Sequence, residues 1–196
     1  MALDIQPLTP DRLPHLAELF GEGGDPKWCW CAYYRVRGMD FSAGGSARHR
    51  KVLEAATRAS VGDDQAPGLV AYDGDTAVGW VSVGPREDYE RLAHSRVLAP
   101  VDDTPVWSIV CFVVGRQARG QGVAHALLDA AIDYARAHGA TTVEAYPVEV
   151  PDGERIDSAV VYKGTLSMFE RRGFEVVVRR QHNRASPVRP TVRLEL

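Results

Sequence analysis

A glycine-rich turn between an apolar strand and an amphipathic helix is the clearest place for chemistry in this sequence. The apolar run 106–114 predicts a buried strand, and apolar residues at i, i+4 spacing predict a helix from about Gly122 to His138. No Ser, Thr, Asp or Asn precedes this helix to cap its first N–H groups. Those N–H groups carry partial positive charge, Gly120 and Gly122 permit close approach of a ligand, and Arg119 adds a cation. The turn therefore predicts an anion site, for which phosphate is the usual ligand.

Two other phosphate-binding loops fit this turn less well. A Walker A loop requires Gly-Lys-Ser/Thr, and the sequence has none there. A dinucleotide-binding loop requires a small residue where His125 stands, and its first glycine should follow the strand directly. Glu144 nevertheless stands about 20 residues farther on, where such a loop places its ribose-binding acid. A nicotinamide-dependent oxidoreductase therefore stays open as an alternative.

Glu144 also interrupts an otherwise β-rich, apolar run, Thr141–Val148, which predicts a strand. Burial of an unpaired carboxylate is costly, so this residue requires an explanation. Either Glu144 has a functional role, or it faces water while Val143 and Ala145 face the core. The sequence leaves both explanations open.

An aromatic segment, KWCWCAYYRVRG at 27–38, contains two of the three cysteines and predicts a short helix. Cys29 and Cys31 are too close together for half of a zinc ribbon, no second pair exists, and His49 is isolated. Cys111, in the apolar strand, is expected to be a small buried hydrophobic residue. We expect no metal site.

The whole chain predicts a mixed α/β domain. Along its 196 residues, the predicted order of elements is a strand, two helices, three strands, a helix, a strand, a helix and two strands. Thr9 is expected to cap the first helix, residues 47–60 to form the second, and residues 160–172 to form the last. We expect one domain over 1–196, with a helical region at 1–65 and a core at 66–196.

Composition limits the function classes. The chain is 45% hydrophobic and 25% charged, with a net charge of −3 and a pI near 6.1, which does not favour nucleic acid as a partner. No apolar run is long enough to span a membrane, and residues 1–13 do not resemble a signal peptide. An odd number of cysteines without a secretion signal indicates free thiols and a cytoplasmic location.

Two motifs carry a family resemblance. The stretch FVVGRQARGQGVAHALL resembles the acetyl-CoA-binding signature of the GNAT acetyltransferase superfamily, Arg/Gln-x-x-Gly-x-Gly/Ala after a strand, with Arg119, Gly122 and Ala124 in the motif positions. The stretch MFERRGF at 168–174 resembles the closing helix-to-strand signature of the same family. The resemblance covers roughly residues 69–196. It implies a GNAT fold, with a central mixed, mostly antiparallel sheet flanked by helices.

The resemblance also implies a cosubstrate, acetyl-CoA, whose diphosphate would cap the helix that lacks a capping side chain. In this family the pantetheine arm lies between two diverging central strands. Cofactor contacts then fall on the strand end, Phe112, Val113 and Val114, and on the turn and helix start, Arg119, Gly120, Gln121, Gly122, Val123 and Ala124.

The implied reaction is direct transfer of the acetyl group to a primary amine of a small molecule or peptide. Family resemblance makes Glu144 the candidate base. The family's usual tyrosine acid is replaced by Phe169, so Tyr162 is the candidate acid, with Tyr146 as an alternative. The aromatic residues expected to bind the acceptor amine are Trp28, Trp30, Tyr33 and Tyr34.

Phe169 also leaves a second function class open, a non-catalytic sensor or partner module that binds acyl-CoA. The net negative charge slightly disfavours an acidic acceptor. The resemblance allows a homodimer, and it does not identify the acceptor.

Overall fold

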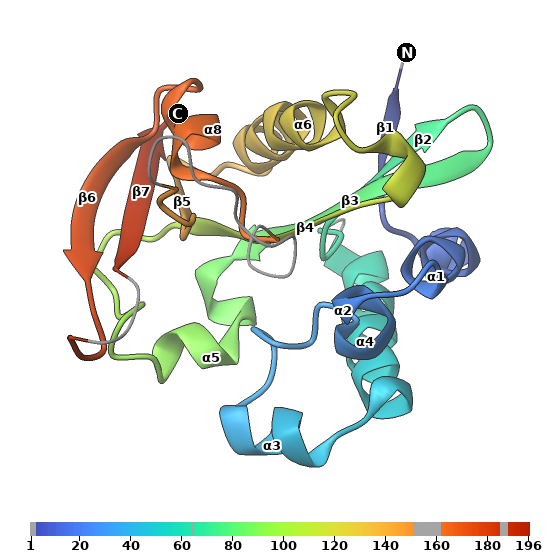
Figure 1. The fold of residues 1–196 in the computed structure, drawn as a ribbon, viewed down its shortest axis with the longest axis horizontal. Coiled ribbons are helices and arrows are strands. Elements are labelled where there is room, and N and C mark those ends of the chain that lie inside the picture. Colours follow the sequence, from blue (N-terminus) through green and yellow to red (C-terminus); the bar gives the residue numbers. More distant parts are fainter. Residues whose placement is uncertain (1–2, 64, 151–161, 185–187) are drawn as a thin grey trace.

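The fold is a seven-stranded sheet with helices on both faces, seen in a computed structural model that describes residues 3–63, 65–150, 162–184 and 188–196 (Figure 1). The strands run in the order β1-β2-β3-β4-β5-β7-β6, and every neighbouring pair is antiparallel except the parallel pair β4–β5. The predicted mixed, mostly antiparallel sheet is confirmed. The strands are β1 (Asp4–Pro7), β2 (Leu69–Asp73), β3 (Thr76–Pro85), β4 (Trp107–Val114), β5 (Thr142–Ala145), β6 (Glu175–Arg180) and β7 (Arg189–Glu195).

The helices divide between the two faces of the sheet. One face carries α6 (Val123–Ala137) and α8 (Leu166–Glu170), and Figure 1 shows α2, α3, α4 and α5 on the opposite side. None of the helices among the described residues is long and apolar enough to cross a membrane. The remaining helices and single 3-10 turns are η1 (Pro10–Arg12), α1 (Leu13–Gly21), α2 (Asp25–Cys29), α3 (Gly38–Ala43), α4 (Ser46–Asp63), η2 (Arg86–Asp88), α5 (Glu90–Ala93) and η3 (Arg116–Ala118).

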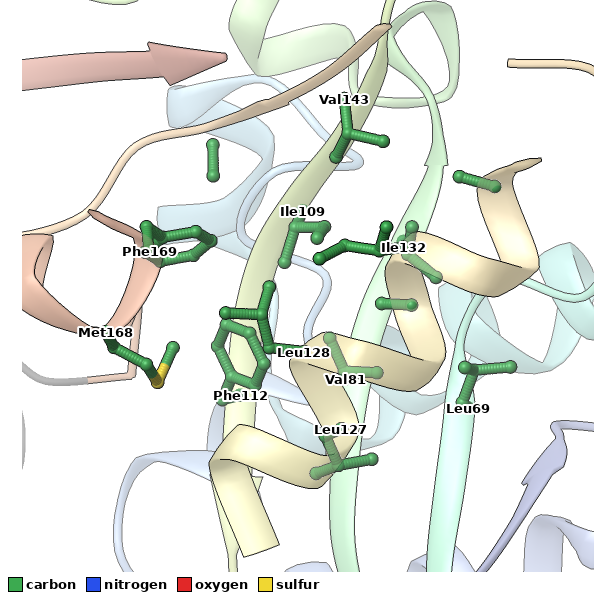
Figure 2. Packing of buried hydrophobic residues seen from close by; sticks show 14 of the residues in the cluster. Leu69, Val81, Ile109, Phe112, Leu127, Leu128, Ile132, Val143, Met168 and Phe169 are labelled. Carbon is green, nitrogen blue, oxygen red and sulfur yellow. The ribbon is translucent and has the colours of Figure 1, made fainter. Parts of the chain in front are cut away.

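Each face of the sheet has its own hydrophobic cluster. Figure 2 shows the first, in which Leu127, Leu128 and Ile132 of α6 pack on the strands beneath, while Met168 and Phe169 of α8 approach β4 from the side. The second cluster joins α1 and the aromatic segment to the other face. Side chains alternate between faces along a strand, so each central strand serves both clusters. This explains why β4 is an unbroken apolar run.

The divergence of β4 and β5 positions the site. Their ladder ends at the pair Ile109–Ala145, although β4 continues to Val114. Beyond this point the Phe112 N–H donates instead to the carbonyl of Tyr162, over a distance of 2.6 Å. The two central strands thus part in the middle of the sheet, directly before the glycine-rich turn.

The structure corrects several predicted elements. Thr9 makes no capping bond and instead accepts a hydrogen bond from Arg12 (3.3 Å). The aromatic segment is helical only to Cys29, because Trp30 adopts a left-handed backbone (φ 48°) that ends the helix. The strand predicted over 141–148 ends at Ala145, before a proline that has no N–H for the ladder.

Other predicted elements are confirmed. The helix predicted over 47–60 is α4, and the helix predicted from Gly122 is α6. The helix predicted over 160–172 is only partly confirmed, because α8 covers Leu166–Glu170 and residues 162–165 are not helical, while residues 160 and 161 lie outside the described residues. β1 pairs with β2, so both predicted parts of the domain contribute to one sheet, while a boundary at residue 65 stays a prediction.

Candidate active site

A cleft of about 750 Å³ opens where β4 ends and α6 begins. Its walls come from the end of β4, the glycine-rich turn, the α1–α2 connection and the segment that leads into α8. All residues predicted to contact the cofactor line this cleft except Gln121, whose amide donates to the Gln117 carbonyl (2.7 Å). The cleft-lining members of that set are Phe112, Val113, Val114, Arg119, Gly120, Gly122, Val123 and Ala124.

The backbone of the turn requires its glycines. Gly120 and Gly122 have φ values of +75° and +82°, which residues with a Cβ rarely adopt. No side chain caps the first turn of α6, and a Cβ built on either glycine would meet no atom within 4 Å. The start of the helix therefore faces open space at the cleft wall.

The charges of the cleft suit an anion at the helix start. Arg116, Arg119 and Arg171 all line it, together with two carboxylates, Glu22 and Asp25. The Glu22 carboxylate accepts the backbone N–H of Arg116 (3.0 Å), so part of its charge is held by the chain itself. Sequence reasoning missed Arg171, although it stands inside the MFERRGF motif.

Tyr162 is the predicted catalytic residue that the structure places in the cleft. Burial raises the pKa of its phenol, and the neighbouring Tyr33 raises this pKa further. The phenol therefore stays protonated at neutral pH, and the raised pKa makes it a weaker acid than an ordinary tyrosine. Phe169, at the family's usual tyrosine position, is fully buried and packs edge-on against Phe112 and Phe174.

Glu144 lies outside the cleft, in a buried network of charges. Its side chain is 1% exposed, so it does not face water. One carboxylate oxygen accepts from Arg86 (2.8 Å) and from the Tyr146 hydroxyl (2.7 Å), and the other accepts from Arg193 (2.9 Å). Arg193 also pairs with Asp102 (2.7 Å), and its hydrogen bond lowers the pKa of that carboxyl. We call these five residues the Glu144 network.

The Glu144 network satisfies its own charges. Tyr146 also shares a hydrogen bond with Ser108 of β4 (3.0 Å), and burial raises the pKa of the Tyr146 phenol. Two guanidinium groups and one hydroxyl thus occupy both oxygens of the Glu144 carboxylate. The geometry therefore explains the charged residue in the apolar strand by pairing.

The four predicted acceptor-binding aromatics separate into two groups. Trp28 is partly exposed and packs edge-on against Phe41, while Trp30 is buried and donates to Ser46 (3.1 Å). Tyr33 and Tyr34 instead line a second cavity of about 430 Å³. Of the four aromatics, these two tyrosines line the second cavity, and neither tryptophan lines the cleft or the second cavity.

The second cavity lies next to the cleft, because Tyr162 lines the cleft and the following residue, Lys163, lines the second cavity. Sequence reasoning missed most of its wall, since the residues come from distant segments. Its lining residues beyond the two tyrosines are Arg37, Gly38, Arg91, His94, Ser95, Val97, Leu98, Lys163, His182 and Arg189.

The three cysteines are free thiols. Cys31 and Cys111 are both buried, with their sulfur atoms 3.2 Å apart, and Trp80 donates to Cys31 (3.2 Å). His49 is also buried and bonds to the carbonyls of Trp28 and Phe41. Across the described ranges no group of three His, Cys, Asp or Glu side chains could hold a metal ion.

Solved acetyltransferase structures share this fold at low sequence identity. A polyamine N-acetyltransferase from Drosophila melanogaster, which forms N-acetylagmatine, matches with a TM-score of 0.62 and 11% identity over 100% of both chains. The PaiA N-acetyltransferase from Thermoplasma acidophilum, in complex with coenzyme A, matches with a TM-score of 0.57 and 14% identity over 100% of both chains. The NatC complex bound to Gag peptide and CoA matches with a TM-score of 0.56 and 14% identity, covering 100% of this chain and 99% of the other.

Sequence comparison identifies the family. No curated protein sequence gives a significant match to this chain. A family model for the acetyltransferase (GNAT) family matches residues 30–156, well over half of the chain, including β4, the glycine-rich turn and α6. The chain therefore belongs to the acetyltransferase (GNAT) family.

Proposed function

We propose that this protein is an acetyl-CoA-dependent N-acetyltransferase that moves an acetyl group directly to a primary amine of a small molecule or peptide. Membership of an acetyltransferase family supports an acyl transfer. The observation that carries the proposal is the start of α6, which has no side-chain cap and faces the cleft of about 750 Å³. Two glycines with positive φ form the turn before this helix, and three arginines line the same cleft. A diphosphate at this position would accept the helix N–H groups and balance the arginines.

The reaction balances without an added cofactor. The neutral amine nitrogen attacks the thioester carbonyl, the new C–N bond forms, and the C–S bond breaks. The amine loses one proton and the departing thiolate gains one, which gives the acetamide and free coenzyme A. The carbonyl oxygen carries negative charge in the transition state, and a β4 N–H is the expected donor to it.

The catalytic roles of Glu144 and Tyr162 stay predictions. The position of Tyr162 in the cleft supports the acid role for the leaving thiolate, whereas the raised pKa of its phenol counts against it. Glu144 lies outside the cleft and both of its carboxylate oxygens are already hydrogen-bonded, which counts against direct proton abstraction by this residue. The Tyr162→Phe variant is expected to lose kcat by about a hundredfold with CoA affinity unchanged. Glu144→Gln should lower kcat comparably only if Glu144 is the base, so the pH–rate profiles of the two variants separate the roles.

The helix start is tested by two matched glycines at opposite ends of α6. Gly122 and Gly139 have φ values of +82° and +80°, and a Cβ at either would meet nothing within 4 Å. Alanine at each position should therefore lower the free energy of unfolding by a similar amount, about 1–2 kcal/mol. Gly122→Ala alone should weaken CoA binding, by about tenfold in calorimetry, because its Cβ enters the proposed diphosphate site.

Two outcomes would count against the proposal. Equal CoA affinity in both glycine variants would remove the start of α6 from the cofactor site. Saturable CoA binding by the wild type, without thiol release for any amine, would favour the sensor module over the enzyme.

Relatives' acceptors support an amine substrate without identifying it. The Drosophila neighbour is a polyamine N-acetyltransferase that forms N-acetylagmatine, and the NatC neighbour is bound to a Gag peptide and CoA. A cytoplasmic location and a homodimer stay predictions. Size-exclusion chromatography with light scattering would test the dimer.

A further inference from the structure

The second cavity has the position of an acceptor chamber. Tyr162 and Lys163 are consecutive residues, and Tyr162 lines the cleft while Lys163 lines the second cavity. Tyr33 of the cavity wall lies close enough to Tyr162 to raise its pKa. A small molecule bound in the second cavity would thus lie beside the end of β4, where the acetyl group is expected. A volume of about 430 Å³ is within the range of small-ligand sites.

The wall of this cavity is strongly cationic. Arg37, Arg91, Lys163 and Arg189 all line it, as do two histidines, and none of the described lining residues is a carboxylate. The four cations come from α3's N-terminal flank, α5, the segment before α8 and the start of β7. Four separate chain segments therefore direct positive charge to one small volume.

Most of this charge has no acidic partner in the described part of the chain. Arg37 pairs with Glu90 at 2.8 Å, outside the cavity wall. No carboxylate of the described residues forms an ion pair with Arg91, Lys163 or Arg189, whereas both arginines of the Glu144 network are paired. The cations thus remain available to a ligand.

Arg91 gives the most specific geometry. Its guanidinium stacks on the Tyr33 ring at 3.7 Å, and its Nε donates to the Tyr33 carbonyl. One terminal nitrogen is buried and, among the described residues, has no hydrogen-bond partner. A buried donor without a partner is costly, and an acceptor oxygen from a ligand would remove that cost.

Lys163 and Arg189 disfavour each other's charge. Burial and, to a smaller extent, the charge of Arg189 together lower the pKa of the Lys163 ammonium to about 8. An anion between these two residues would relieve the repulsion. A second ammonium group, as on a polyamine, would add to it.

We propose that the acceptor is a small amine that also carries an anionic group, a carboxylate or a phosphate, which Arg91, Lys163 and Arg189 bind in the second cavity. The proposal rests on the N-acetyltransferase function proposed above and specifies its substrate class. It differs from the expectation based on net charge, because a value of −3 averages the whole surface and says nothing of one cavity. Tyr33, Val97 and Leu98 leave an apolar side of the wall for the remainder of the acceptor.

The first test compares acceptors that differ only in charge. Each common L-amino acid is paired with its carboxamide, 2-aminoethylphosphonate is paired with propylamine, and 1,3-diaminopropane is the cationic arm. Thiol release from acetyl-CoA gives kcat/KM, expressed per neutral amine. The kcat/KM of the best anionic acceptor should exceed that of its uncharged partner by at least about tenfold. Comparison of the amino acids with 2-aminoethylphosphonate shows whether the site prefers a carboxylate or a phosphonate. Preference for a carboxamide or for the diamine would overturn the proposal.

The second test removes one cation. Arg189→Gln should raise KM for the preferred anionic acceptor by about tenfold and leave the uncharged partner unchanged. Arg136→Gln is the matched control, since Arg136 is half exposed on α6 and pairs with Asp133 at 2.6 Å. CoA affinity should stay the same in both variants. A weaker CoA affinity in Arg189→Gln alone would assign the cavity to the cofactor and overturn the proposal.

A third measurement, the ligand-induced shift in Tm, tests the anion site even if the proposed enzyme function fails. If no amine is acetylated while CoA binds, the proposed function fails and ligand-induced thermal shifts decide the anion site. An amino acid or 2-aminoethylphosphonate should then raise the Tm of the wild type more than its uncharged partner does, and Arg189→Gln should abolish this difference. Equal shifts for both partners would overturn the anion site as well.

Discussion

The Glu144 network and the second cavity both contain arginine side chains, but in the part of the chain that the structure describes the arginines of the network are paired with carboxylates and most cations of the cavity are not. In the network, Arg86 and Arg193 both form ion pairs with the buried Glu144 carboxylate, and Arg193 forms a second ion pair with Asp102. In the second cavity, Arg91 and Arg189 have no carboxylate partner among the described residues. Buried cations that are paired hold a fold together, whereas cations gathered without partners prepare a site for an anion.

The two regions also share a structural element. Arg86 of the network donates to the Leu98 carbonyl (2.5 Å), and Leu98 lines the second cavity. Arg180 of β6 bonds to the next two carbonyls of the same loop, those of Ala99 and Pro100. The paired region therefore fixes one wall of the unpaired region.

Loss of the central carboxylate should have the largest effect on stability. Glu144→Leu leaves Arg86 and Arg193 in a site where their side chains are 12% and 9% exposed. The free energy of unfolding in urea should fall by about 3–5 kcal/mol. Glu144→Gln keeps the shape and one acceptor oxygen and should lose less. A loss below about 1 kcal/mol in Glu144→Leu would show that the network does not stabilise the fold.

Loss of an unpaired cation should have the opposite sign. The pKa of Lys163 is lowered from 10.5 to about 8, so the folded state disfavours its charged form. The contribution of Lys163 to stability is thus present above pH 10.5 and is lost as the pH falls through 8. Lys163→Met should stabilise the protein at pH 7, by up to about 3 kcal/mol, and give no such gain near pH 11.

The Lys163 comparison needs an exposed lysine as its control. Lys51 lies on the exposed side of α4, and Lys51→Met should change the stability at pH 7 by less than about 0.5 kcal/mol. Urea unfolding at both pH values measures both variants. Destabilisation by Lys163→Met at pH 7 would mean that this cation already has a partner.

Glu90 gives the smallest effect and refines the comparison. Its pair with Arg37 is about half exposed, so Glu90→Gln should change the free energy of unfolding by less than about 1 kcal/mol. The variant also frees Arg37 beside the second cavity. KM for an anionic acceptor should fall by about two- to threefold, with the uncharged partner unchanged. An increase in KM would contradict an anionic acceptor.

Local patterns made part of this molecule predictable. The apolar strand, the glycine-rich turn and the helix after it were predicted because their periodicity and backbone requirements lie within one short stretch. Gly139 is a comparable case, since its positive φ follows from its place after α6. Half of the residues that line the cleft come from this stretch, and most of the predicted cofactor residues are among them.

Long-range partners could not be predicted from these patterns. Glu144 meets Arg86 and Arg193 across 58 and 49 residues of chain, and no spacing rule links them. The aromatic segment divided between core and cavity because Trp30 and Cys31 both take a left-handed backbone, which redirects the chain after α2. The cations of the second cavity meet only through the tertiary fold, so their shared location has no sequence signature.

The hydrogen bond from the Phe112 N–H to the Tyr162 carbonyl has a kinetic consequence. A pantetheine arm that pairs with β4 at this position competes for the same hydrogen and releases Tyr162. Lys163 is the next residue, so on the proposed function displacement of Tyr162 would also move the wall of the second cavity. If acetyl-CoA takes this hydrogen bond as proposed, the amine would then meet a cavity wall that the cofactor has already altered, so acetyl-CoA would be expected to enter first.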